Sequence, residues 1–256
     1  MKETLIKNVG KNVKPRKPVL VVGLPGIGLV GKLAVEHMVK ELKAERIAEL
    51  YSPHFPHQVI MRKKGTLRML RNRFYYWKNP KKGESDIIFL VGDVQAITSE
   101  AQHEVCGKIL DYFIKMRGKR IYTLGGYGVG KMVESPKVFG SATSKELVRE
   151  MSKKGILFGK ANGSIIGAAG LLLGLGHLRG MEGLCIMGET HGGYVDAKCA
   201  QSVLKVLSSV VGIKVDLAKL EQRAKESERF MKKMEKEAGK QKELQGMPES
   251  GLSYIR

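Results

Sequence analysis

The stretch "VLVVGLPGIGLVGKLAVEHMV" (residues 19–39) joins a hydrophobic run to a glycine-rich turn and then to an apolar pattern of helical spacing. Its first four residues predict a buried strand, and the apolar residues from Leu29 onward predict a helix. Gly26, Gly28 and Gly31 have the G-x-G-x-x-G spacing of dinucleotide-binding turns. Such a turn either offers backbone N–H groups to an anion or lets the helix pack closely on its strand.

Predicted strands and helices alternate from residue 19 to residue 212, and residues 155–176 predict a strand, a turn and a glycine-rich helix. Alternation of this kind is typical of an α/β protein with a largely parallel sheet and helices on both faces. Glycine turns follow three of the predicted strands, at 23–31, 125–130 and 188–193. Because ligands usually bind at the carboxyl ends of parallel strands, these turns predict a crevice of ligand size.

Local signals also mark the ends of several predicted helices. Thr98 or Ser99 is the predicted N-cap of a helix, because its hydroxyl can accept a hydrogen bond from a free N–H of the first turn. Gly155 and Gly212 are predicted to end the helices that precede them.

The composition of the chain suits a folded cytoplasmic protein. Its 256 residues include 43% hydrophobic residues and 31 glycines, which is enough to form one substantial core. The three cysteines have no C-x-x-C spacing and predict buried thiols in a reducing compartment. The N-terminus has no signal-peptide pattern, and the most apolar stretch, residues 164–178, is too short to span a membrane. We therefore expect a cytoplasmic protein that has no membrane partner.

The formal net charge of +20 bears on solubility and on anionic partners rather than on fold. Much of the charge lies in residues 62–82, which contain nine basic residues, no acidic residue and four consecutive aromatics at 74–77. Basic residues interleaved with aromatics can follow a phosphate backbone and stack on bases, so an RNA-binding module is one hypothesis. The other interpretation, which we favour, is a solvated hairpin whose alternate aromatics face the core.

The character of the sequence changes after residue 212, and we predict three parts: an α/β domain at 1–212, a helix at 213–245 and a flexible tail at 246–256. The predicted helix has abundant helix formers and a weak heptad pattern. Its seam consists of Leu217, Leu220, Ala224, Met231 and Met234. This apolar stripe either rests on its own domain or packs against another subunit.

The tail contains Gly246, Pro248 and Gly251, which prevent a continuing helix, yet it ends in apolar side chains. These side chains are Leu252, Tyr254 and Ile255. The end of the tail is then a frayed terminus, a strand that docks on its own domain, or an anchor that fills a pocket on a partner. A tyrosine suits an anchor because its rigid ring buries a large area at little entropic cost.

Motifs for catalysis are sparse in this sequence. Glu49 lies about twenty positions beyond the glycine turn, where a dinucleotide site needs an acidic residue for the ribose. The H-E-x-x-H, G-x-S-x-G and Walker patterns are absent. No basic partner can be assigned to Cys185 or Cys199 from the sequence, so a role as nucleophile is unsupported for either thiol. The residues considered as metal ligands are His54, His57, Asp93, Glu189, His191 and Asp196. Their spacing is not that of a metal site, so we expect no catalytic residue, no metal and no cofactor. The alternative is a nucleoside- or nucleotide-binding enzyme that uses the glycine-turn crevice.

Seven stretches of the chain, in order, are "LPGIGLVGKLAVEH", "YSPHFPHQV", "FLVGDVQ", "YTLGGYGVGK", "GAAGLLLGLG", "GMEGLCIMGET" and "YVDAKCAQSVLKVL". Together they resemble the archaeal branch of the proteasome assembly chaperone family, the homologues of the second eukaryotic assembly chaperone. The resemblance implies a three-layer α/β domain with a central mixed, largely parallel sheet, similar in topology to purine nucleoside phosphorylases but without their catalytic residues. It also implies an ATP-independent homo-oligomer that engages the α-subunit ring of the proteasome core particle. Gly26, Gly28 and Gly31 are then expected to form a packing turn and a candidate anion-binding turn rather than an NAD site.

The resemblance also implies a role for the tail. Related archaeal chaperones end in a hydrophobic-Tyr-X motif that docks in pockets between α subunits, where the C-terminal carboxylate meets a lysine. The similar residues in this chain are Leu252, Tyr254, Ile255 and Arg256. Here Tyr254 is third from the end and follows Ser253, whereas the motif has its tyrosine second from the end after a hydrophobic residue. We therefore expect a non-enzymatic homo-oligomeric chaperone or adaptor that docks its tails on the proteasome α ring. A further alternative comes from the archaeal family branch that pairs with another small protein instead of the proteasome.

Overall fold

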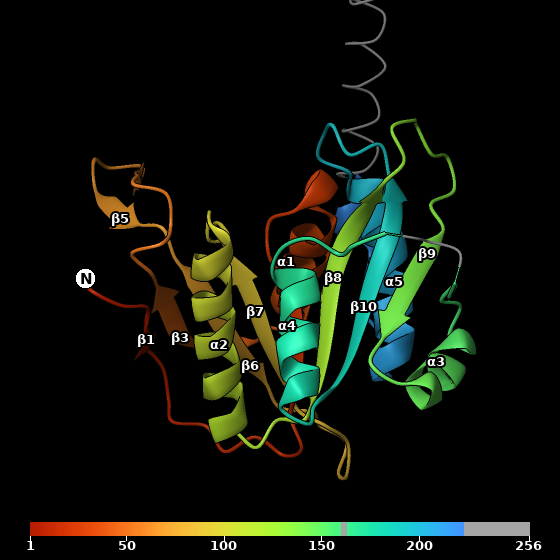
Figure 1. The fold of residues 1–256 in the computed structure, drawn as a ribbon, viewed down its shortest axis with the longest axis horizontal. Helices are drawn as coiled ribbons and strands as arrows, with labels where there is room; N and C mark the ends of the chain where they lie inside the picture. The colour runs from red at the N-terminus through yellow and green to blue at the C-terminus, as the bar shows by residue number, and fades with distance from the viewer. Residues whose placement is uncertain (160–162, 223–256) are drawn as a thin grey trace, which may run out of the picture.

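The computed structural model describes residues 1–159 and 163–222. In chain order the described elements are β1 (Leu5–Asn8), β2 (Val19–Gly23), η1 (Ile27–Leu29), α1 (Val30–Glu41), β3 (Glu45–Tyr51), β4 (Val59–Met61), β5 (Leu67–Met69), β6 (Asn72–Trp77), β7 (Ile87–Gly92), α2 (Ser99–Lys115), β8 (Arg120–Gly128), β9 (Val138–Ala142), α3 (Lys145–Ser152), α4 (Ala168–Leu178), β10 (Glu182–Thr190) and α5 (Ala197–Val211). Figure 1 shows three layers, in which the sheet lies between α2 and α4 on one side and α1 and α5 on the other.

The central sheet has eight strands in the order β1-β3-β6-β7-β2-β8-β10-β9. The strands β7, β2, β8 and β10 form a parallel centre, and the strands on both flanks are antiparallel to their neighbours. Every residue of β2 and β7 is buried, because helices cover both faces of the sheet, and this explains their unbroken hydrophobic runs. The structure therefore confirms the predicted α/β class with a central mixed, largely parallel sheet. The strands β4 and β5 form a separate hairpin.

Side-chain alternation along the strands divides the interior into two cores. Val19 and Val21 belong to the core that is completed by α1 and α5. Leu20 and Val22 belong to the opposite core, which is completed by α2 and α4. The period of two along a strand sends successive side chains to opposite faces, so one strand serves both cores. The loops at the carboxyl ends of the parallel strands are left as the accessible edge of the sheet.

Several helix boundaries follow the predicted signals. The Thr98 Oγ1 accepts a hydrogen bond from the N–H of Ala101 at 3.3 Å, which confirms the N-cap predicted at Thr98 or Ser99. Gly212 ends α5 in the left-handed conformation with a φ of 69°, as predicted. Among the residues that the structure describes, no helix is both long and apolar enough to cross a membrane.

Two segments differ from the prediction. The strand β9 was not predicted, and it pairs antiparallel with β10 at the edge of the sheet. The strand predicted just after Gly155 is only an isolated bridge between Phe139 and Leu157. Because β9 already occupies the place beside β10, the backbone of Leu157 reaches only β9, to which it bonds through Val138 and Gly140.

The predicted helix at 213–245 and tail at 246–256 are described only as far as Gln222. A helix begins at Ala218, whose N–H donates a 2.9 Å hydrogen bond to the Asp216 carboxylate. Leu220 is fully buried in the core beside α1 and α5, and Leu217 packs at the edge of that core. At these two positions the stripe therefore rests on its own domain. The predicted site residues outside the described part of the chain are Ala224, Met231, Met234, Leu252, Tyr254, Ile255 and Arg256.

Candidate functional site

A cavity of about 1140 Å³ lies at the carboxyl ends of β2, β8 and β10, where the glycine turns predict a crevice. Its floor is apolar and includes Leu24, Leu124 and Met187. Its walls come from the glycine turn before α1, the loop between β7 and α2, and the segment from Ser164 into the first turn of α4. Three segments distant in sequence therefore meet at this edge of the sheet, as the alternating pattern predicts.

The glycine turn brings α1 directly against the sheet. A Cβ atom on Gly31 would lie 2.6 Å from the carbonyl carbon of Leu124 in β8, and closer still to its oxygen. A Cβ atom on Gly23 would lie 2.6 Å from the Cγ2 of Val35 in α1. Gly28 has a φ of 62°, and its carbonyl oxygen accepts the N–H of Asp196 at 2.9 Å. Close packing explains the glycines at positions 23 and 31, and the left-handed backbone explains the glycine at position 28.

Gly26 is the exception in this turn. It has extended backbone with a φ of −161°, and no atom lies within 4 Å of an added Cβ. No contact in the structure therefore requires a glycine at this position. The candidate anion-binding role of Gly26, Gly28 and Gly31 remains a prediction.

The described residues that line the cavity include no Lys, Arg, Asp or Glu, although the chain carries a net charge of +20. The ionisable side chains among them are those of His103, Tyr127 and Cys185. Burial raises the pKa of Cys185 to about 11, against a smaller lowering by the neighbouring Thr123 side chain, so the thiol stays protonated near neutral pH. Phosphate groups and metal ions are usually bound by charged side chains. The lining therefore suits an uncharged, largely apolar group.

One glutamine side chain joins three walls of the cavity. The Gln95 Nε2 donates to the carbonyl oxygen of Pro25 at 2.5 Å. Its Oε1 accepts the N–H of Ala168 at 2.8 Å and the Nε2 of Gln102 at 3.1 Å. Both ends of the Gln95 amide are therefore engaged within the protein. This arrangement fixes the glycine turn relative to α2 and α4, and it leaves the Gln95 amide committed to structure rather than to a ligand.

The mouth of the cavity is apolar as well. Ile27, Ile97 and Ile166 are 50%, 68% and 88% exposed, and each comes from a different one of the three walls. Large exposed apolar side chains around a cavity indicate contact with an apolar partner rather than with a polar substrate. Sequence reasoning located this crevice but not its chemistry, because the lining depends on which side chains the fold brings together.

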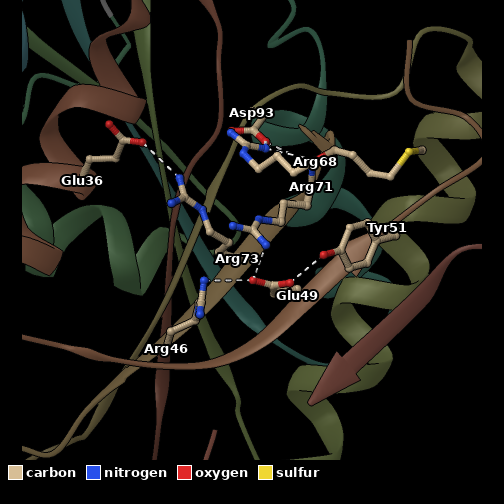
Figure 2. A network of polar contacts seen from close by, with 9 residues as sticks. Glu36, Arg46, Glu49, Tyr51, Arg68, Arg71, Arg73 and Asp93 are labelled. Atoms are coloured by element: carbon tan, nitrogen blue, oxygen red, sulfur yellow. Dashed lines mark hydrogen bonds and ion pairs between the residues drawn. The ribbon is translucent and has the colours of Figure 1, made fainter. Parts of the chain in front are cut away.

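Glu49, the residue predicted for a ribose in the dinucleotide hypothesis, does not face the glycine turn. It lies on β3, which is separated from β2 by β6 and β7. Its carboxylate lies 3.0 Å from Arg46 and 2.7 Å from Arg71, and it accepts a 2.6 Å hydrogen bond from the Tyr51 hydroxyl (Figure 2). Burial raises the pKa of Glu49, but the Tyr51 hydrogen bond and the two arginines outweigh it and hold the pKa below its ordinary value. Glu49 is therefore bonded within the domain and is not placed to bind a ribose at the glycine turn.

Some basic side chains of residues 62–82 form ion pairs with acidic residues of the domain. Arg68 forms an ion pair and a 3.1 Å hydrogen bond with Asp93 at the end of β7, and Arg73 lies 3.5 Å from Glu36 of α1 (Figure 2). Burial raises the pKa of Asp93, but hydrogen bonds from Arg68 and the backbone N–H of Arg71 hold it below its ordinary value. Sequence reasoning missed these pairs, because the acidic partners lie far along the chain.

The four consecutive aromatics occupy β6 and face both cores. Phe74 is fully buried and packs against Tyr112, with ring centroids 4.7 Å apart. Tyr76 faces the same core, whereas Tyr75 and Trp77 pack on the other. These rings are committed to the interior, which favours the interpretation of alternate core-facing aromatics over a base-stacking platform.

The polar residues considered as metal ligands are separated by the fold. Asp93 is paired with Arg68, Asp196 caps α5 by accepting the N–H of Cys199, and Glu189 accepts the N–H of Lys137. His54 lies 3.6 Å from Glu104, and His191 lies against Tyr194. In residues 1–159 and 163–222, no group of three or more His, Cys, Asp or Glu side chains is placed to hold a metal ion.

Comparison with known proteins gives a consistent result. The sequence matches the PAC2 family over residues 20–235. The crystal structure of PbaB from Pyrococcus furiosus, described as an archaeal proteasome activator, is similar with a TM-score of 0.87 and 42% identity, covering 92% of this chain and 100% of that chain. PbaA from the same organism, described as an archaeal homolog of proteasome-assembly chaperone, is similar with a TM-score of 0.74 and 27% identity, covering 95% of this chain and 98% of that chain. An uncharacterized protein of Methanocaldococcus jannaschii is 38% identical over an alignment 258 residues long, gaps included, which covers 98% of each chain.

Proposed function

The chain belongs to the PAC2 family, and on that premise we propose that it is a non-enzymatic, homo-oligomeric adaptor that docks on the α ring of the proteasome core particle. The observation that carries this proposal is the similarity to PbaB, a protein described as a proteasome activator, which extends over the whole of that chain. Because a shared fold alone does not imply a shared function, the 42% sequence identity to PbaB supports the proposal more than the fold does.

The chemistry of the described residues supports a binding role. Among the described residues of the cavity lining no side chain is charged, and the Gln95 amide is bonded within the protein. Burial raises the pKa of Cys106 to about 12 and also raises the pKa of Cys199, so neither thiol is an activated nucleophile. The acidic residues considered for catalysis or metal binding are paired, cap a helix or accept backbone N–H groups. A protein that binds by surface complementarity requires none of these groups to be free.

In the proposed mechanism the C-terminal tail makes the specific contact. The Tyr254 ring fills a pocket between α subunits, with Leu252 and Ile255 beside it, and the Arg256 carboxylate pairs with a lysine of that pocket. Each tail binds weakly alone, because a flexible segment loses conformational entropy when it docks. Several tails on one oligomer act together through their effective concentration.

Deletion of residues 250–256 tests this proposal. The shortened chain is expected to keep its melting temperature and oligomeric mass and to lose binding to purified core particle. Tyr254→Ala should reproduce the loss, whereas Glu249→Gln, which alters the tail just outside the docking residues, should bind like the unmodified chain. Unchanged binding after deletion of the tail would refute the assigned mechanism.

A nucleoside- or nucleotide-binding enzyme is the second candidate function, and the cavity at the carboxyl ends of the parallel strands is the observation in its favour. The uncharged lining weighs against phosphorylated ligands. A scaffold for another small protein is the third candidate, and it predicts an intact oligomer that does not bind core particle.

A further inference from the structure

The β4–β5 hairpin carries an apolar face that no described residue covers. Val59 pairs with Met69, and Met61 pairs with Leu67. Because side chains alternate along a strand, these four residues lie on one face of the hairpin. They are 46%, 50%, 88% and 67% exposed, respectively. Figure 1 shows the hairpin standing away from the sheet on the side of β1 and β3.

The opposite face of the hairpin is fixed to the domain. Ile60 is half-buried against the core beside α2. Its cross-strand partner Arg68 is paired with Asp93 at the end of β7. The same carboxylate accepts the N–H of Arg71 at 3.1 Å, just before β6. A two-stranded hairpin is marginally stable alone in water, so these contacts hold the apolar face in a defined orientation.

The tip of the hairpin is cationic. Arg62, Lys63 and Lys64 are exposed, and none of them has an ion pair within the described part of the chain. No acidic residue occurs between positions 59 and 83. An apolar face beside an all-positive tip is complementary to a protein surface with an apolar centre and an acidic rim. A second copy of a chain with a net charge of +20 would bring like charges together at this surface.

The side chains of the face favour a protein over other macromolecules. Two of the four are methionines, whose flexible thioethers adapt to irregular protein surfaces. The segment 59–69 contains no aromatic residue that would stack on bases or sit at a membrane interface.

We infer that the face formed by Val59, Met61, Leu67 and Met69, together with the basic tip, docks on an apolar protein surface with an acidic rim. The inference rests on the proposed function, in which that surface belongs to the core particle. The hairpin is then a second contact beside the C-terminal tail. It explains why an anchored two-stranded element exposes four apolar side chains.

The test measures the dissociation constant of full-length variants for immobilised, purified core particle. Met61→Thr with Leu67→Thr removes apolar area at exposed strand positions, and binding should weaken by about tenfold or more. Lys63→Glu with Lys64→Glu should weaken binding by about tenfold and reduce its dependence on salt. Leu178→Gln, at an exposed apolar residue of α4, and Lys153→Glu with Lys154→Glu, at an exposed pair after α3, are the matched controls and should bind within about twofold of the unmodified chain. Melting temperature and oligomeric mass are measured for every variant.

The outcomes separate this inference from the proposed function. If the unmodified chain binds, the tail deletion does not, and both hairpin variants bind like the unmodified chain, the hairpin inference is overturned and the proposed function stands. If the unmodified chain does not bind, the proposed function falls and the inference falls with it. A changed oligomeric mass in the hairpin variants would instead make the face a subunit interface. The unmodified chain is also tested on anionic vesicles. If it binds them, if only the Lys63/Lys64 variant loses that binding, and if core-particle binding is unchanged, the basic tip is a lipid contact instead.

Discussion

Replacement of Gly31 by alanine tests why the turn before α1 carries its glycines. The new Cβ would lie 2.6 Å from the carbonyl carbon of Leu124 and closer to its oxygen, whereas carbon atoms pack best at about 3.5 Å. The neighbour is backbone of a central strand and cannot rotate away, so α1 must move by roughly 1 Å. Overpacking of this kind costs about 3 kcal/mol, and the better helix propensity of alanine returns about 1 kcal/mol. The expected net loss is about 2 kcal/mol.

For a domain of this size, about 2 kcal/mol corresponds to a fall of about 4–8 °C in melting temperature, measured by circular dichroism at fixed protein concentration. Gly26→Ala is the control within the same motif, because its Cβ meets no atom within 4 Å and its backbone is extended. It should change stability by less than about 0.5 kcal/mol. Equal losses in the two variants, or no loss in Gly31→Ala, would refute the packing explanation of the turn.

Four further predictions follow from the described contacts. Leu220→Ala should cost about 3 kcal/mol at every protein concentration, and a loss that disappears at high concentration would place Leu220 in a subunit interface instead. Glu49→Gln should cost about 2 kcal/mol in urea unfolding, because Arg71 would stay largely buried without its charged partner, and a neutral effect would contradict this. Burial raises the pKa of Asp86 and of Asp93, but hydrogen bonds lower it by more, so both carboxyl groups have a pKa below the ordinary value. Their stabilisation is therefore present in full above the unfolded pKa of about 4 and is lost as the pH falls through the lower folded pKa. The melting temperature should fall below about pH 4, less steeply in Asp93→Asn, and an equally steep fall in that variant would argue against the pair. NAD, ATP and nucleosides should leave the melting temperature unchanged, and a saturable rise with any of them would favour the enzyme hypothesis.

Strongly periodic segments could be predicted from the sequence because local and global preferences agree there. The strand β2 is buried on both faces and is therefore an unbroken hydrophobic run, and α5 ends at the glycine that its left-handed conformation requires. The strand β9 could not be predicted, because its five residues contain Gly140 and two polar or small residues. Its extended conformation comes from pairing with β10, which is a tertiary contact.

The position of the candidate site could also be predicted, whereas its chemistry could not. Glycine turns after parallel strands identify the carboxyl edge of the sheet, and the cavity is there. That its described lining residues include no charged side chain depends on the packing of α2 and α4, which no local pattern encodes. The same limit applies to the basic run, where Arg68 is neutralised by Asp93, 25 residues further along the chain. The strand order, which separates Glu49 from the glycine turn by two strands, likewise follows from topology rather than from spacing.

The most direct test of the account is a cryo-electron microscopy map of core particle saturated with the full-length protein. The account predicts density for residues 252–256 in the pockets between α subunits, with the Tyr254 ring enclosed and the Arg256 carboxylate beside a lysine. A bound complex in which these pockets are empty, or in which the same residues pack on their own α/β domain, would contradict it.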